Sequence, residues 1–495
     1  MIADSLRARL GLRREGDERH AVIDIGSNTV RLVIYGGPPR APAVLWNEKV
    51  SARLGRDLAK SGEIPAAAID DALTALARFA HIVSELGITQ VETVATAAPR
   101  EASNGPEFVR RVEALGLAVR VLSGEEEACA SAWGAIGAFP RAQGVVADLG
   151  GGSLELVPIA DGQCGEGATY PLGTLRLPAL RTGGKFAQKV AKLLKGAPAA
   201  GGADPLYMIG GTWRAFASYA MRLADHPLSD PHGYSMAASD AVTLAKSLAR
   251  AKPAQFSQAG ISTMRAEKLP DAAALLQVLI EELQPEALVF SSWGLREGLY
   301  FRSLPPDEQG MDPLLAGVDH FTAARGGNAA DASLIARWTA QVARIAGPAT
   351  ETLRLAAAKL TLALHCVEPN LRGPQALEWA LDKRWVGIDF AGRAMLGAAL
   401  RGSLGVIEPH ARLVRLASEG ELREATAWGL AFRLAQRLGA GARNPLADSQ
   451  LRISGDALEL RLPDKHSPLI SGPINKNLGA LATWLGLSPK VTIGD

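Results

Sequence analysis

Cysteine is scarce in this chain of 495 residues. The three cysteines are Cys129, Cys164 and Cys366, and no two of them form a Cys-x-x-Cys pair. This spacing excludes a zinc ribbon and argues against a framework of disulfides.

An excess of charge of one sign is also lacking. The 53 Lys and Arg residues almost balance the 51 Asp and Glu residues, which leaves a net charge of +2. Such a balance predicts no nucleic-acid partner. No uncharged apolar run is long enough to span a bilayer, so we expect no integral membrane segment. Residues 1–20 are basic and lack the apolar core of a signal peptide. We therefore expect a flexible tail there, on a cytoplasmic protein.

Glycine and proline, in contrast, are plentiful, with 52 and 29 residues. They favour a fold with many tight turns, and the length predicts about three domains. One pattern of strand, Asp-x-Gly, polar turn and strand occurs twice. Asp24-Ile-Gly-Ser-Asn-Thr-Val-Arg-Leu-Val matches Asp148-Leu-Gly-Gly-Gly-Ser-Leu-Glu-Leu-Val, and the two copies start 124 residues apart. This period is too long for a solenoid and predicts two half-domains of like fold that face each other.

Each copy places a carboxylate at the end of a strand, beside a turn that contains glycine. Glycine lets backbone N–H groups approach a phosphate closely, and the Asp can hold a metal ion between carboxylate and phosphate oxygens. Neither copy is a Rossmann or Walker loop, since those lead into a helix. Gly210-Gly-Thr212 does open a helix and is either a third phosphate-binding element or a plain tight turn.

The run Ser123-Gly-Glu-Glu-Glu-Ala128 begins a helix of small residues that we expect to end near Ala138. Ser123 and Glu126 have the spacing of a capping box, and the helix dipole favours Glu125. Glu127 has no such structural task. It is therefore the candidate general base that orients and deprotonates water for attack on phosphorus.

These segments resemble the exopolyphosphatase/guanosine pentaphosphate phosphohydrolase family, within the actin-like ATPase superfamily. The resemblance covers about residues 20–302. The matching motifs, in the order of the family, are Asp24-Ile-Gly-Ser-Asn-Thr, Ala95-Thr-Ala-Ala-Pro-Arg-Glu-Ala-Ser-Asn104, Ser123-Gly-Glu-Glu-Glu-Ala128, Asp148-Leu-Gly-Gly-Gly-Ser-Leu-Glu155, Tyr170-Pro-Leu-Gly-Thr-Leu-Arg-Leu177, Gly210-Gly-Thr-Trp-Arg214, His232-Gly-Tyr234 and Ser292-Trp-Gly-Leu-Arg-Glu-Gly298.

The resemblance implies an α/β fold with two actin-like (ribonuclease H-like) half-domains around a cleft, at residues 21–138 and 139–305. A mostly helical C-terminal domain would follow at residues 310–495. Longer family members carry a region there that resembles metal-dependent His-Asp phosphohydrolases. In this chain the nearest candidate is His365 followed by Cys366, where Asp would be needed. We therefore interpret the region as degenerate and His365 as an ordinary, partly buried residue.

The resemblance also assigns roles to single residues. Glu127 matches the catalytic base, and Arg100 matches an arginine that contacts phosphate. The substrate-binding residues would be Asp24, Gly26, Ser27, Asn28, Gly150, Gly151, Gly152 and Ser153, together with Gly210, Gly211 and Thr212. The residues around a divalent cation, Mg²⁺ or another, would be Asp148, Glu155, Glu127 and Asp24.

Charge suggests a separate task for the C-terminal region. Residues 311–495 hold 21 Lys and Arg against 17 Asp and Glu, an excess of four, whereas the rest of the chain holds 32 against 34. Arg433 and Arg437 are one helical turn apart. They are either part of a solvated face or contacts for a long polyanion.

The predicted function is hydrolysis of terminal phosphates from inorganic polyphosphate. An alternative keeps the site and removes the 5′ γ-phosphate of guanosine pentaphosphate (pppGpp), the substrate that would connect the chain with the stringent response. A third possibility is a nucleotide-sensing switch without hydrolysis, which Trp213 disfavours if its bulk crowds an adenine. A homodimer is expected from the family alone.

Overall fold

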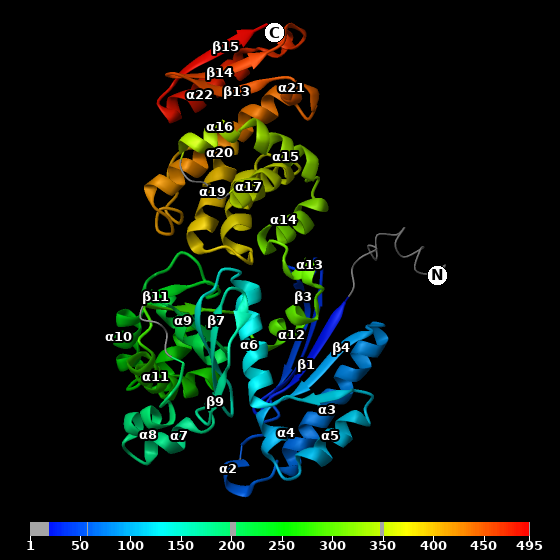
Figure 1. Ribbon diagram of the computed structural model, residues 1–495, viewed down its shortest axis with the longest axis vertical. Helices are drawn as coiled ribbons and strands as arrows, with labels where there is room; N and C mark the ends of the chain where they lie inside the picture. Colours follow the sequence, from blue (N-terminus) through cyan, green and yellow to red (C-terminus); the bar gives the residue numbers. More distant parts are fainter. Residues whose placement is uncertain (1–18, 57, 199–203, 347–350, 495) are drawn as a thin grey trace. The chain divides into compact units, whose positions relative to one another are not determined.

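Two units make up the chain, residues 1–311 (unit 1) and residues 312–495 (unit 2). The computed structural model describes residues 19–56, 58–198, 204–346 and 351–494 (Figure 1). All but the last two residues of the predicted N-terminal tail lie outside the described residues.

The first sheet of unit 1 has five strands in the order β3-β2-β1-β4-β5. Its strands are β1 (His20–Ile25), β2 (Val30–Gly36), β3 (Ala43–Val50), β4 (Gln90–Ala95) and β5 (Val119–Val121). Strands β1, β4 and β5 are parallel, and β2 is antiparallel to both β1 and β3. The accompanying helices are α2 (Leu58–Ser61), α3 (Ala66–Glu85), α4 (Ala97–Glu101), α5 (Gly105–Glu113) and α6 (Gly124–Ala138).

The second sheet has the order β11-β12-β10-β6-β7-β8, with β9 also paired to β7. Its strands are β6 (Gly144–Leu149), β7 (Leu154–Ala160), β8 (Gln163–Cys164), β9 (Ala168–Tyr170), β10 (Leu206–Ile209), β11 (Ser235–Ala237) and β12 (Ala287–Phe290). Its helices are α7 (Leu177–Thr182), α8 (Phe186–Leu193), α9 (Gly211–Leu223), α10 (Ala238–Leu248), the 3₁₀ helix η1 (Pro253–Ala259), α11 (Thr263–Leu283), α12 (Leu295–Ser303) and α13 (Pro306–Gln309).

The two Asp-x-Gly segments have the same local structure. Each lies between two antiparallel strands, β1 and β2 in the first copy and β6 and β7 in the second. The N–H of Gly26 donates to the carbonyl of Thr29 at 3.0 Å, and the N–H of Gly150 donates to the carbonyl of Ser153 at 3.0 Å. The predicted strand–turn–strand repeat is therefore confirmed.

Both central strands are buried on their two faces. In β1, Ala21 and Ile23 belong to one hydrophobic cluster, whereas Val22 belongs to another. In β6, Val145 and Val146 are divided in the same way. Such burial gives the continuous apolar runs of the sequence, which are typical of strands covered by helices on both sides.

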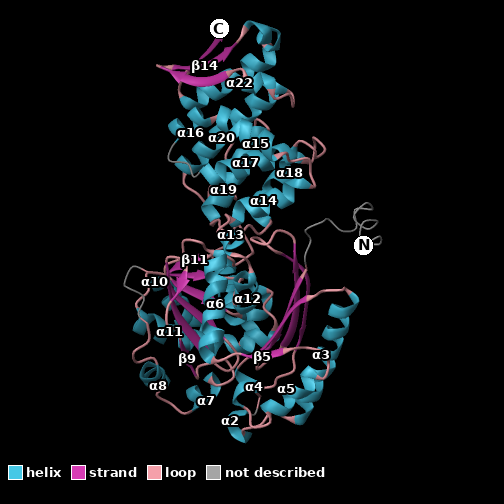
Figure 2. Ribbon diagram, turned by 45° about the vertical axis from the view of Figure 1, so that its right-hand side comes forward, coloured by secondary structure: helices cyan, strands magenta, loops and turns pink. Residues whose placement is uncertain are grey.

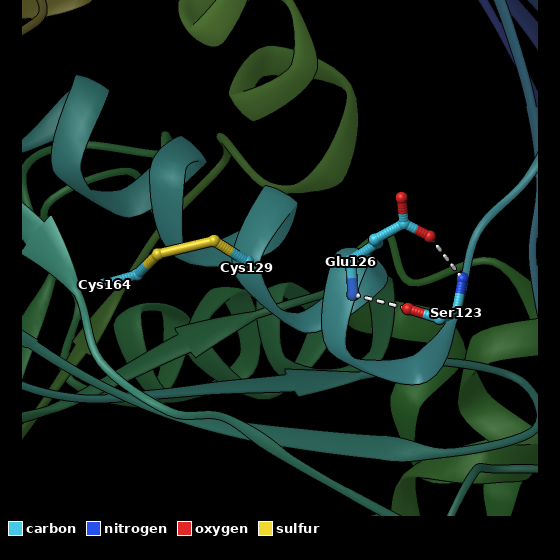
Figure 3. Close-up of a disulfide and its surroundings, with 4 residues drawn as sticks. All are labelled: Ser123, Glu126, Cys129 and Cys164. Carbon is cyan, nitrogen blue, oxygen red and sulfur yellow. Dashed lines mark hydrogen bonds between the residues drawn. A yellow bond between two sulfur atoms is a disulfide. The ribbon is translucent and has the colours of Figure 1, made fainter.

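Helices α6 and α12 lie between the two sheets (Figure 2). Glycine makes their close packing possible, because a Cβ atom at Gly298 would overlap the carbonyl oxygen of Ala130. A Cβ atom at Gly134 would likewise overlap the backbone of Gly294. The predicted capping box starts α6, since Ser123 Oγ accepts from the N–H of Glu126 and the Glu126 carboxylate accepts from the N–H of Ser123 (Figure 3).

A disulfide between Cys129 and Cys164 joins α6 to β8 (Figure 3). The sequence argued against a disulfide framework, because the two residues are 35 positions apart and form no motif. The packing of α6 on strands β7 and β8 brings their Cα atoms to 6.2 Å. Cys366 is free and exposed.

Other differences arise where local signals are weak. The motif from Ala95 to Asn104, for which no helix was predicted, contains the short helix α4. Strand β3 was not predicted, because its residues are mostly exposed and lack an alternating pattern. Helix α11 was not predicted, because it contains Pro270 and a proline inside a sequence usually indicates the end of a helix.

Unit 2 begins as a helical domain and ends in a small sheet. Its helices are α14 (Pro313–Ala323), α15 (Ala329–Trp338), α16 (Ala340–Ala346), α17 (Glu351–Leu364), α18 (Arg372–Leu377), the π-helix η2 (Glu378–Asp382), α19 (Phe390–Ser403), α20 (Glu419–Gly439), α21 (Asn444–Ala447), the 3₁₀ helix η3 (Asp464–Leu469) and α22 (Gly472–Leu485). Strands β13 (Gln450–Ser454) and β14 (Ala457–Leu462) form a hairpin, and β15 (Ser488–Ile493) pairs with β14 in parallel. Among the described helices of the whole chain, none has the length and apolar character of a membrane span.

Candidate active site

A cleft of about 220 Å³ in unit 1 brings the predicted loops together. The two Asp-x-Gly loops face each other, because a Cβ atom at Gly151 would lie 3.3 Å from the Cβ of Ser27. The predicted residues that line the cleft are Asp24, Gly26, Ser27, Asn28, Glu127, Asp148, Gly150, Gly151, Gly152, Ser153, Gly210, Gly211 and Thr212. The predicted residues Arg100 and Glu155 are not among the residues that line it.

The loop carbonyls are engaged by neighbouring segments. The carbonyl of Ser27 accepts from the N–H of Gly55 at 2.7 Å, and that of Gly151 accepts from the N–H of Leu175 at 2.9 Å. Among the described residues, the N–H groups of Ser27, Asn28, Gly151 and Gly152 find no acceptor. These donors are therefore available to an anion in the cleft.

The two copies differ in the charge opposite their Asp. Asp24 on β1 is paired with Arg31 on β2, whereas Asp148 on β6 is paired with Glu155 on β7. Directly opposite residues lie on one face of a sheet, within interaction distance. The first copy therefore pairs opposite charges across the two strands, whereas the second places two carboxyl groups opposite each other.

Burial raises the pKa of Asp24, Asp148 and Glu155. Asp24 is compensated by Arg296, whose Nη1 donates to its Oδ2 at 3.0 Å. Asp148 accepts from Ser131 Oγ at 2.5 Å. The Oε1 of Glu155 is shielded from solvent and has no hydrogen bond within the described part of the chain. In Glu155, the negative charges of Glu127 and Asp148 add to the effect of burial.

Glu127 lies in the first turn of α6 and lines the cleft. Its Oε2 accepts a hydrogen bond from Arg100 Nη1 at 3.0 Å, and the same Nη1 donates to the carbonyl of Leu122 at 2.8 Å. Burial raises the pKa of Glu127 to about 7, although the hydrogen bond and charge of Arg100 oppose the increase. A carboxylate with this pKa can accept a proton from water near neutral pH.

Six basic residues that sequence reasoning missed line the same cleft. They are Arg31, Lys49, Arg214, Arg265, Lys268 and Arg296. Burial, followed by the positive charge of Arg296, lowers the pKa of Arg31 and of Arg214 to about 10. The cleft is therefore electrostatically prepared for a strongly anionic ligand.

Signals for half of these basic residues were present in the motifs. Arg31 follows the first loop, Arg214 ends Gly210-Gly-Thr-Trp-Arg214, and Arg296 lies within Ser292-Trp-Gly-Leu-Arg. Lys49 on β3 and the pair Arg265 and Lys268 on α11 carry no local signal. Only the fold brings these three to the cleft.

Two interpretations of single residues need correction. Trp213 does not crowd the cleft, since its side chain is fully buried in the core of the second half-domain. His365 is exposed rather than partly buried. Arg433 and Arg437 lie on α20 in unit 2, where they line a separate cavity.

Comparisons with known proteins decide the family. The model of the Ppx/GppA phosphatase family matches residues 33–307, which is more than half of the chain. The chain belongs to the Ppx/GppA phosphatase family. The match ends before unit 2 begins.

Curated relatives agree with this assignment. Exopolyphosphatase 1 of Mycobacterium leprae is 28% identical over 318 residues, which cover 59% of this chain and 91% of the relative. Exopolyphosphatase 1 of Mycobacterium tuberculosis is 26% identical over 336 residues, 63% of this chain and 96% of the relative. With the family membership, these relatives identify the chain as a phosphoanhydride hydrolase.

Solved structures share the fold. A Ppx/GppA family member from Aquifex aeolicus aligns with a TM-score of 0.50 at 24% identity, covering 57% of this chain and 95% of that chain. An exopolyphosphatase from Cytophaga hutchinsonii has the same score and identity and covers 57% and 97%. The predicted fold class, two actin-like half-domains around a cleft with a mostly helical C-terminal domain, is confirmed.

Proposed function

We propose that the chain is an exopolyphosphatase that releases terminal orthophosphate from inorganic polyphosphate. The observation that supports this most strongly is the composition of the cleft. Free backbone N–H groups and six basic side chains surround the space that Glu127 faces. Such a lining suits a ligand made of phosphate groups alone.

In the proposed reaction, the terminal phosphoryl group lies between the two loops. The N–H groups of Ser27, Asn28, Gly151 and Gly152 donate to its oxygens. Glu127 orients a water molecule and accepts its proton as the oxygen attacks phosphorus in line. Arg100 holds the carboxylate in position. The next phosphate leaves as the new chain end, and the basic side chains neutralise its charge.

The carboxylates fit a divalent cation by their chemistry. Asp148 and Glu155 are paired across two strands, and Glu155 has an oxygen without a partner. In the described ranges no group of three or more His, Cys, Asp and Glu side chains has the arrangement of a complete metal site. Mg²⁺ usually binds one or two carboxylates and takes its other ligands from water and substrate phosphates. We propose that Asp148 and Glu155, with Glu127 and Asp24 nearby, hold the cation, which would neutralise charge on the phosphoryl group.

Removal of the γ-phosphate from pppGpp is the second candidate, because the same groups would serve it. The cleft favours the inorganic substrate. None of its described lining residues is aromatic, so none can stack on a guanine. The curated relatives reported above are also named exopolyphosphatases.

Phosphate release from polyphosphate of defined length, compared with pppGpp, tests the proposal. Both substrates are measured with Mg²⁺ and with EDTA. We expect turnover of polyphosphate to exceed that of pppGpp and to depend on Mg²⁺. Faster turnover of pppGpp would instead support the second candidate. Undiminished turnover in EDTA would show that the reaction does not need a divalent cation.

A further inference from the structure

Unit 2 contains a cavity of about 960 Å³, separate from the cleft in unit 1. Residues of the helices α15, α17, α18, α19, α20 and α21 line it, together with the segments that follow α17, α19 and α20. Small-molecule sites in proteins typically enclose about 300–1,000 Å³, so a nucleotide-sized ligand fits.

Positive charge dominates the charged residues that line this cavity. Among the described residues that line it are four Arg and one acidic residue, Asp331, which is paired with Arg443 at 2.5 Å. Arg372, Arg433 and Arg437 have no carboxylate partner among the described residues. Three guanidinium groups therefore remain without a counter-charge.

The three guanidinium groups lie near one another. Arg372 Nη2 donates to the carbonyl of His365 at 2.7 Å, and the positive charges of all three arginines act on the imidazole of His365. Enclosure lowers the pKa of Arg433, and the charge of Arg437 adds to this effect. Arg433 is fixed by Asn477 Oδ1 at 2.7 Å, whereas Arg437 is exposed and donates to none of the described residues. Arg437 is thus free to bind an anion beside its fixed neighbour.

Part of the cavity lining is apolar. Leu334 and Ile335 of α15, Leu404, Val406 and Leu446 contribute aliphatic surface. The side-chain amide of Gln436 is shielded from solvent and lies beside the imidazole of His365, which also lines the cavity. An amide can recognise a ring that carries both donors and acceptors.

We propose that this cavity binds an organic phosphate of nucleotide size, with its phosphates on Arg372, Arg433 and Arg437 and its ring against the aliphatic wall. Inorganic polyphosphate has no apolar surface to bury there. The site goes beyond the proposed hydrolysis and does not require it.

Isothermal titration calorimetry of the full chain with ATP tests this proposal, with tripolyphosphate as the inorganic probe. EDTA is present, so that hydrolysis and cation-dependent binding in the cleft are suppressed. Arg437→Gln removes the exposed guanidinium. Arg337→Gln is the matched control, because Arg337 is exposed on the same helix as Leu334 but does not line the cavity. Arg265→Gln reports on binding in the cleft.

We expect ATP to bind more tightly than tripolyphosphate. Its Kd should increase at least tenfold in Arg437→Gln and stay within twofold in Arg337→Gln and Arg265→Gln. No ATP binding at millimolar concentration would overturn the proposal, as would weakening by Arg265→Gln without weakening by Arg437→Gln. If ATP and tripolyphosphate bind with equal affinity and both need Arg437, the ligand is not required to be organic. That result would overturn the proposal and indicate that the cavity binds inorganic polyphosphate.

Leu334→Gln provides a second variant. Because Leu334 is only half-buried, its replacement should preserve the fold. The replacement should raise the Kd of ATP at least threefold and leave the Kd of tripolyphosphate unchanged. An equal effect on both probes would contradict the placement of the ring.

Discussion

Arg100 donates a hydrogen bond of 3.0 Å to Glu127, from a short helix that follows β4 to the first turn of α6. The pair joins two motifs, and its two residues are 27 positions apart in the sequence. Because Arg100 also donates to the carbonyl of Leu122, it is held on both sides. The carboxylate of Glu127 is therefore oriented before any substrate arrives.

The first prediction concerns Glu127→Gln. The variant should fold and bind polyphosphate but lose about 10²–10⁴-fold in kcat, because an amide cannot accept the proton of water. Phosphate release and a binding measurement on the same preparation check this. Glu126→Gln is the control, since Glu126 forms the capping box and does not line the cleft. A larger loss in Glu126→Gln would reverse the two assignments.

The second prediction is a pH profile. With the pKa of Glu127 at about 7, kcat/KM should increase with pH up to about 7 and then level off, because only the ionised carboxylate acts as a base. Arg100→Gln removes a hydrogen bond and a positive charge that lower this pKa, so the acidic limb should move to higher pH. Arg110→Gln, an exposed change on α5, should leave the profile in place. An unmoved limb in Arg100→Gln would show that the rate depends on another group.

Local sequence explains much of this site. The turns after Asp24 and Asp148 and the cap at Ser123 each depend on residues within a few positions, and all three appear as predicted. The pairing of Asp148 with Glu155 also follows from the hairpin register. These features need no long-range information.

Features that depend on distant contacts were not predicted. Arg265 reaches the cleft from α11, more than 200 positions after the first loop. Cys129 meets Cys164 only because α6 packs on the second sheet. The cavity in unit 2 combines residues from Asp331 to Leu446. The spacing of residues along the chain does not predict these long-range contacts, because they depend on how the helices pack.

The third prediction tests the basic wall of the cleft. Arg265→Gln combined with Lys268→Gln should raise KM for polyphosphate about tenfold and reduce kcat much less, because these residues bind phosphates away from the attacked one. As with other polyanions, the dependence of KM on salt should become less steep. The double variant Arg222→Gln and Lys246→Gln, with both changes at exposed positions, is the matched control. Equal KM values in both double variants would exclude a substrate role for α11.

The last prediction concerns the disulfide between Cys129 and Cys164. Closing a loop of this length stabilises a protein by about 2–4 kcal/mol, mainly because it restricts the unfolded chain. Dithiothreitol should therefore lower the urea concentration at the midpoint of unfolding of unit 1 in the wild-type chain. Cys129→Ser should lower it by a similar amount and abolish the effect of the reductant. Cys366→Ser, which removes the free thiol, should change neither value.

Because Cys129 is two residues from Glu127 on the same helix, loosening α6 should also reduce kcat. If reduction leaves both the midpoint and kcat unchanged, the bond does not hold α6 in place.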